Sequence, residues 1–205
     1  MSTQENFEQT NFNELFKEIP GEKYPQKRTY KGKTIFLIDK FPVKNKEKLI
    51  FSIESVNSDY PQGFRIGVYN GYLKINGEPT KNSKKTNILF WEDSEVLDVK
   101  NIVVQVFTKS DSIYISNIWE ETIYEEPVTT VYEDLTMETY MRKYPEGKKI
   151  ACYTGAGRCA IIGNTCANAM YSEDIPNGKR YFCNDGDEDD DFDDIIFTVT
   201  RVNSE

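Results

Sequence analysis

The chain has 205 residues and a net charge of -9, with 34 acidic against 25 basic side chains. It contains no histidine, which excludes Ser-His-Asp, Cys-His and His-based zinc protease chemistry. The acidic balance, with no basic patch, argues against a nucleic-acid partner. Thirteen tyrosines, 12 phenylalanines and only 8 prolines are typical of a folded chain that forms one large or two small domains.

Residues 1–30 are predicted to form an N-terminal arm that carries one short amphipathic helix. Within residues 11–19, Phe12, Leu15, Phe16 and Ile19 recur at the spacing of one helix face, and Pro20-Gly21 ends the element. We expect this apolar face to pack against the body of the protein or, alternatively, against another subunit.

Residues 31–123 are predicted to form an antiparallel β-sandwich of jelly-roll type. Seven short segments are rich in Ile, Val, Phe and Tyr and are mostly separated by turn residues, namely 33–39, 48–55, 64–69, 72–76, 87–91, 101–107 and 112–119. Asn70-Gly71 between two of them is a strong hairpin signal. The block is similar in architecture to carbohydrate-binding modules, so the fold class we expect is all-β.

Two tryptophans end strands in this block, and each is followed by acidic residues. Trp91 and Trp119 are therefore candidate glycan-binding residues, because a ring beside a carboxylate can stack on a sugar and bond its hydroxyls. The alternative is that both are ordinary core residues, which is where tryptophan is usually found.

Residues 124–205 are predicted to form a smaller β-rich domain with a second short helix near Met137–Tyr144. It holds all four cysteines, Cys152, Cys159, Cys166 and Cys183, which are expected either as two disulfides or as reduced thiols. Disulfides would favour an extracellular or cell-surface location. The sequence as given opens with no signal peptide, and no apolar stretch approaches the roughly 20 residues that span a membrane.

The strongest chemical signal is the run from Asn184 to Asp194, in which eight of eleven residues are Asp or Glu. The run is followed directly by a predicted strand, Ile195–Val202, which fixes its end and allows its carboxylates to converge. Oxygen ligands without histidine or a thiolate pair suit Ca²⁺. The run is not an EF-hand, because Asp190 and Ile196 stand where that loop needs Gly and Glu. The alternative is a solvated acidic turn.

The residues Glu188 to Phe197 resemble the C-terminal signature Gly-Asp-x-Asp-Phe-Asn-Asp, followed by a hydrophobic strand, of a domain of unknown function in bacterial secreted and surface proteins. Here Glu188 replaces the Gly and Asp193 the Asn of that signature. The resemblance implies a calcium site with Asp189, Asp191 and Asp194 as ligands, completed by Glu173 or Asp174 from an upstream pair. We add Asp187, within the same run, as a further candidate ligand.

These features predict a non-enzymatic, calcium-binding interaction or structural protein, in which Ca²⁺ orders the acidic turn and supports glycan binding or self-assembly into a homo-oligomer. One alternative is an acidic inhibitor, such as an immunity protein, that binds a basic partner. A second alternative is a glycoside hydrolase that uses a pair of aspartates as acid and base.

Overall fold

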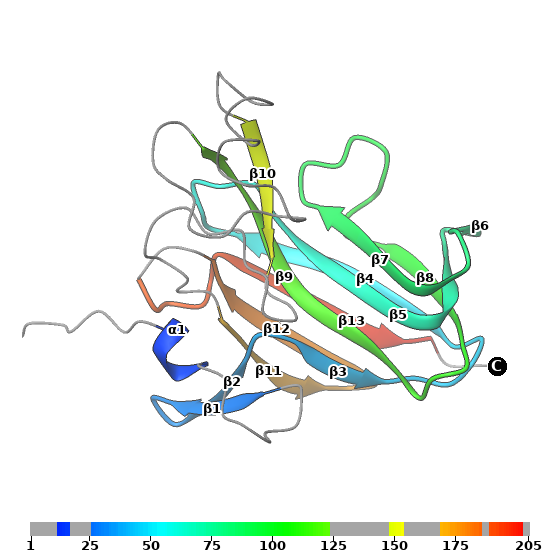
Figure 1. The fold of residues 1–205 in the computed structure, drawn as a ribbon, viewed down its shortest axis with the longest axis horizontal. Coiled ribbons are helices and arrows are strands. Elements are labelled where there is room, and N and C mark those ends of the chain that lie inside the picture. The colour runs from blue at the N-terminus through cyan, green and yellow to red at the C-terminus, as the bar shows by residue number, and fades with distance from the viewer. Residues whose placement is uncertain (1–11, 17–25, 124–147, 154–168, 186–188, 203–205) are drawn as a thin grey trace, which may run out of the picture.

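A computed structural model describes residues 12–16, 26–123, 148–153, 169–185 and 189–202 (Figure 1). Within these residues the protein is all-β, as predicted, apart from a single helical turn, α1 (Phe12–Leu15). The described strands are β1 (Lys27–Tyr30), β2 (Lys33–Phe36), β3 (Asp39–Pro42), β4 (Lys48–Val56), β5 (Gln62–Ile75), β6 (Glu78–Pro79), β7 (Ser83–Trp91), β8 (Ile102–Thr108), β9 (Ser112–Ile123), β10 (Lys148–Tyr153), β11 (Ala169–Ile175), β12 (Gly178–Asn184) and β13 (Ile195–Arg201).

The strands form one antiparallel sheet that curls into a half-barrel (Figure 1). The order along the sheet is β1-β2-β11-β12-β13-β4-β8-β5-β9-β10, while β3 pairs with β9, and β6 and β7 pair with β5. The sequence predicted an antiparallel sandwich of jelly-roll type. The structure confirms the coarser class, all-β, and shows a single curled sheet. The predicted last strand, Ile195–Val202, is confirmed as β13, and it lies between β12 and β4 in the middle of the sheet.

The long strand β5 changes partner along its length. Its first part pairs with β9 through residues 62–67, and its last part pairs with β8 through residues 71–75. The hairpin predicted at Asn70-Gly71 is wrong, because β5 continues through both residues. Asn70 instead adopts a left-handed φ of 50° inside the strand. At Gly71 an added Cβ would lie 2.0 Å from the carbonyl oxygen of Phe107, so only glycine permits this close approach.

Three tight turns contain residues with left-handed backbone. Lys31-Gly32 joins β1 to β2, and Asn76-Gly77 joins β5 to β6, with positive φ at both residues of each pair. Pro176-Asn177 joins β11 to β12, with Asn177 at φ 60° following the proline.

The main core lies inside the curl and is built around stacked aromatic rings. Phe64 on β5 stacks on Phe51, Phe90 and Phe197, with ring centroids 4.9–5.2 Å apart. Tyr181 extends this stack from Phe197 at 4.9 Å. The core thus takes residues from strands on both sides of residue 123. The division into a sandwich at 31–123 and a smaller domain at 124–205 stays a prediction.

A second, smaller cluster covers the other face of the sheet near β2 and β11. Its buried members are Phe12, Phe16, Ile35, Ala169, Tyr171 and Phe192. The helix predicted over residues 11–19 is present only as the single turn α1, whose Phe12 and Phe16 are buried here; residues 17–19 lie outside the described part. The helix predicted near 137–144 also lies outside the described residues.

Cys183 is a free thiol that is completely buried in the main core. Two disulfides that use all four cysteines are therefore not formed. This corrects the alternative, given in the sequence analysis, that the four cysteines form two disulfides. The physical reason is that Cys183 points from β12 into an apolar core, where a thiol packs as a small hydrophobic group. Cys159 and Cys166 lie outside the described residues. Among the described residues, no helix is long and apolar enough to span a membrane.

Candidate metal centre

The acidic run forms the loop between β12 and β13, and its side chains alternate between two sides. Its described residues are Asn184, Asp185 and 189–194. Asp190 and Phe192 both adopt left-handed backbone, with φ of 61° and 62°. The side chains of Asp190 and Phe192 turn inward. Asp189 and Asp191 are exposed, and together with Asp194 they form a cluster of carboxylates. The acidic run therefore forms a loop with an inner and an outer side.

Phe192 and Asp190 fix the inner side of this loop. Phe192 is buried against Tyr171, with ring centroids 5.4 Å apart, and its amide donates to Oδ1 of Asn184 at 3.3 Å. Oδ2 of Asp190 accepts a hydrogen bond from the hydroxyl of Tyr30 and lies 3.4 Å from Nζ of Lys31. Two residues within the acidic run thus attach the loop to the β1 hairpin and the smaller cluster.

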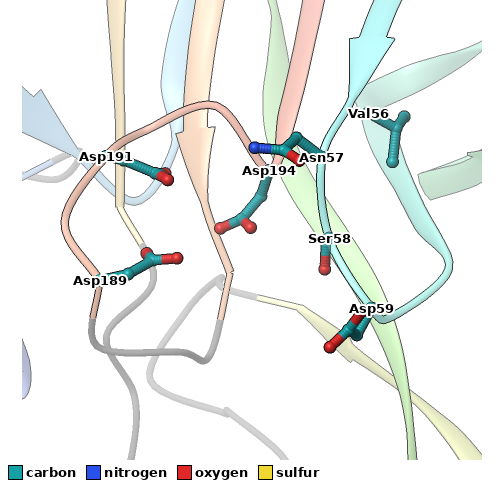
Figure 2. A pocket seen from close by; sticks show the side chains of 7 residues that line it. All are labelled: Val56, Asn57, Ser58, Asp59, Asp189, Asp191 and Asp194. Atoms are coloured by element: carbon teal, nitrogen blue, oxygen red, sulfur yellow. The ribbon is translucent and has the colours of Figure 1, made fainter.

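On the outer side, Asp189, Asp191 and Asp194 each place one carboxylate oxygen within 4.8 Å of the others. Figure 2 shows these three side chains gathered on one side of the loop. Calcium ligands lie about 2.3–2.6 Å from the ion, so oxygens around one ion are separated by at most about 5 Å. The three aspartates could therefore hold one metal ion. The structure brings together the three ligands that the resemblance implied.

Backbone contacts set the positions of these aspartates. Asp194 is only 3% exposed, and its Oδ2 accepts a hydrogen bond from the amide of Asp185 at 2.7 Å. Its carbonyl oxygen accepts from the amide of Asn57 at 3.1 Å. Oδ1 of Asp191 accepts from the amide of Asp193 at 3.1 Å. The cluster is thus joined to the start of β13 and to the segment after β4.

The cluster carries unfavourable negative charge when no cation is bound. Burial and the nearby Asp185 carboxylate raise the pKa of Asp194 to about 8. Burial, followed by the charge of Asp185, also raises the pKa of Asp189. Burial raises the pKa of Asp191, with the charges of Asp189 and Asp193 acting in the same direction. A bound cation would replace the protons that these shifts favour.

Asp185 is a residue of this site that the sequence interpretation did not assign. It is completely buried, and its Oδ2 accepts hydrogen bonds from Oγ of Ser58 and Nε2 of Gln62, both at 2.7 Å. Its position directly after β12 was the available signal, because the strand end orients the next side chain. Its charge acts on Asp189 and Asp194 from inside the protein.

The second wall of the site comes from the segment that follows β4. A pocket of about 440 Å³ lies between this segment and the loop, and it is lined by Val56, Asn57, Ser58, Asp59, Asp189, Asp191 and Asp194 (Figure 2). The lining includes four aspartates and neither lysine nor arginine. A cation in this pocket would meet only negative and uncharged side chains among these residues.

Glu173 and Asp174 are not brought to the cluster. They are exposed on β11, where they pair in register with Arg180 and Lys179 near the Pro176-Asn177 turn. The acidic loop leaves the opposite end of β12, so the β11–β12 hairpin carries the pair away from it. The prediction that Glu173 or Asp174 completes the calcium shell is therefore corrected: the β11–β12 hairpin holds both residues away from the three aspartates. Asp187 lies outside the described residues.

The two tryptophans do not form a shared glycan-binding surface. Trp119 is 2% exposed and pairs with Gln62, whereas Trp91 is partly buried and pairs with Gly63. Because Gln62 and Gly63 are consecutive on β5, the two tryptophans point to opposite faces of the sheet. Trp119 is a core residue, which corrects its assignment as a ligand-binding residue.

No protein-family model, no curated protein and no solved structure matches this chain.

Proposed function

We propose that this protein is a non-enzymatic, calcium-binding interaction or structural protein whose ion binds Asp189, Asp191 and Asp194. The observation that carries the proposal is the convergence of these three carboxylates within 4.8 Å, in a pocket whose lining has no basic side chain. The resemblance of residues 188–197 to a calcium-binding signature supports the same three ligands.

The donor set favours Ca²⁺ over other common cations. Every candidate ligand is a carboxylate oxygen, and the chain has no histidine to attract zinc or copper. Mg²⁺ requires a compact octahedral shell, whereas Ca²⁺ accepts six to eight oxygens in irregular geometry. An open pocket with carboxylates at unequal depths suits the larger ion.

The ion would order the loop and leave part of its shell open to a partner. Three aspartates supply fewer oxygens than Ca²⁺ prefers unless they bind through both oxygens, so positions remain on the side of Asn57, Ser58 and Asp59. A glycan hydroxyl or an acidic group of a second copy could fill them. The jelly-roll class of the fold and an extracellular location remain part of this hypothesis.

A thermal melt in chelator, followed by Ca²⁺ titration, tests the site. We expect stabilisation that grows with the logarithm of the Ca²⁺ concentration and at 100 times the dissociation constant amounts to about 2.7 kcal/mol, or a shift of about 5–10 °C for a chain of this size. Mg²⁺ at the same concentration should shift the melt much less. Light scattering in the same cell reports self-assembly as an increase in particle size.

Substitutions in the cluster provide the matched test. Asp191→Ala and Asp194→Ala should abolish the calcium-dependent shift, whereas Asp98→Ala, an exposed aspartate on the 92–101 loop, should retain it. Equal loss in all three variants, or in none, would refute the assignment of ligands.

The second candidate is an acidic inhibitor of a basic partner, and the exposure of Asp189 and Asp191 favours it. Such binding would weaken strongly as salt rises and would not need calcium. A pull-down in chelator at two salt concentrations separates the two functions, because the calcium module should capture no partner without its ion.

A further inference from the structure

The helical turn α1 packs on the residues that hold the acidic loop. Phe12 is completely buried, and its ring lies 5.8 Å from that of Phe192 and 4.9 Å from that of Tyr30. Figure 1 shows α1 beside the end of the sheet from which the loop emerges. Residues from the two ends of the described chain thus share one small cluster.

This turn is itself attached to the body through β1. Nε of Arg28 donates a hydrogen bond to the carbonyl oxygen of Leu15 at 2.5 Å, and its guanidinium lies 5.8 Å from the ring centre of Phe16. The amide of Phe16 donates to the carbonyl oxygen of Phe12 at 3.0 Å, which closes the turn. The position of Phe12 is therefore set by β1 and by its own turn.

The acidic loop needs such support because its backbone is strained. Asp190 and Phe192 are both non-glycine residues in left-handed conformation, which persists only where surrounding contacts maintain it. Phe192 is maintained by burial against Phe12 and Tyr171. Asp190 is maintained by the hydroxyl of Tyr30, whose ring Phe12 contacts edge-on. Phe12 therefore supports both strained residues.

These two strained residues alternate with the metal-binding ones. Asp191 lies between Asp190 and Phe192, and Asp189 precedes them. If Phe192 leaves its cluster or Asp190 leaves Tyr30, the backbone of residues 189–192 relaxes, and the carboxylates of Asp189 and Asp191 lose their convergence on Asp194. The geometry of the cluster therefore depends on contacts on the opposite side of the loop.

We infer that residues 12–16 act as an intramolecular clamp that holds the acidic loop in its cation-binding geometry, so that Phe12, Tyr30 and Phe192 are positioning residues for the metal centre. The inference rests on the proposed function. Docking of the turn and binding of the cation are then linked, and each strengthens the other by the same factor.

The first test is calorimetric titration of the full chain with Ca²⁺. Phe12→Ala should weaken calcium affinity about tenfold, within the usual range of coupling between sites. Phe12→Leu, which keeps an apolar side chain, should recover most of the affinity. Val68→Ala is the control, because it removes a completely buried side chain from the main core and should lower stability without changing affinity.

The second test needs no cation and uses hydrogen exchange in chelator. Phe12→Ala should increase exchange in residues 189–194 relative to the wild-type chain, whereas Val68→Ala should not do so selectively. Adding Ca²⁺ to the wild-type chain should in turn slow exchange of the Phe16 amide, which closes the helical turn.

The outcomes separate the two proposals. A wild-type chain that binds no Ca²⁺ refutes the proposed function and, with it, the role of the clamp in metal binding. Calcium binding that is unchanged in Phe12→Ala, or equally weakened in Val68→Ala, refutes the clamp alone. Unchanged exchange of residues 189–194 in Phe12→Ala also refutes the clamp, whether or not the metal binds.

Discussion

Asp194 is the last acidic residue of the loop, and its carboxyl group lies at the edge of the protein interior. It is nearly buried, it directly precedes β13, and its raised pKa of about 8 reflects burial and the charge of Asp185. An unfolded aspartate has its usual pKa near 3.8. Between these two values the folded chain binds a proton that the unfolded chain releases, so stability without metal must fall as pH rises through this interval.

The first prediction therefore concerns two pH trends, that of the melting temperature in chelator and that of the additional stabilisation by calcium. In chelator the melting temperature should fall from pH 5 to pH 8, because Asp194 must be deprotonated against its neighbours. Calcium should stabilise more at pH 8 than at pH 5, because it competes with the proton. Melts at three pH values measure both trends. An Asp194→Asn variant that loses stability as steeply as the wild-type chain in chelator would contradict the role of this carboxyl group.

The candidate metal ligands could be predicted from the sequence better than the residues that surround them. A dense acidic run that ends at a strand predicts a cation site, whereas the choice of Asp189, Asp191 and Asp194 as its ligands came from the resemblance to the calcium-binding signature. Asp185 had only its position after β12 as a signal, because its hydrogen-bond partners Ser58 and Gln62 are more than 120 residues away. Glu173 and Asp174 were implied by the resemblance alone, which carries no information on the end of the β11–β12 hairpin that they occupy.

At the scale of elements, β5 shows why a correct local signal can predict the wrong structure. Asn70-Gly71 has the composition of a two-residue hairpin, and Asn70 does adopt the left-handed backbone that such a turn uses. The strand nevertheless continues, because β8 pairs with its second part. The same dipeptide at Asn76-Gly77 does form a turn, between β5 and β6. The difference lies in tertiary pairing, which no local pattern reports.

Substitution of Gly71 tests the importance of this continuation. Gly71→Ala should destabilise the protein by about 2–3 kcal/mol, because its Cβ would meet the backbone of Phe107 and Thr108. Gly67→Ala on the same strand is the matched control, since its new Cβ would meet the side-chain oxygen of Asn87 at 3.0 Å, and that side chain can move. Urea unfolding of the two variants gives the comparison, and equal losses would count against a special role for Gly71.

For the whole molecule, the main core favours unfolding as one unit. Phe64 contacts rings from β4, β7 and β13, so strands from before and after residue 123 contribute to one stack. The all-β class could be predicted from the alternation of apolar segments. The order of the strands could not, because the exchange of partners by β5 and the insertion of β13 beside β4 join segments that are far apart in the sequence.

Denaturation therefore distinguishes one cooperative body from two domains. We expect tryptophan fluorescence and far-ultraviolet circular dichroism to report a single coincident transition. Phe64→Ala should move both probes together, with a loss of about 3–5 kcal/mol. Two separate transitions would instead support the division at residues 123 and 124.

The central position of β13 gives the neighbouring acidic loop a consequence for the unfolded chain as well. Residues 195–202 combine strong strand preference with low charge, which is the composition of segments that form intermolecular sheets when exposed. Until β13 is inserted, both β12 and β4 also present open edges. The dense negative charge directly before β13 acts as a gatekeeper, because stacked copies would bring these carboxylates together. The carboxylates that form the candidate metal centre in the folded protein would thus oppose aggregation while the protein is still folding.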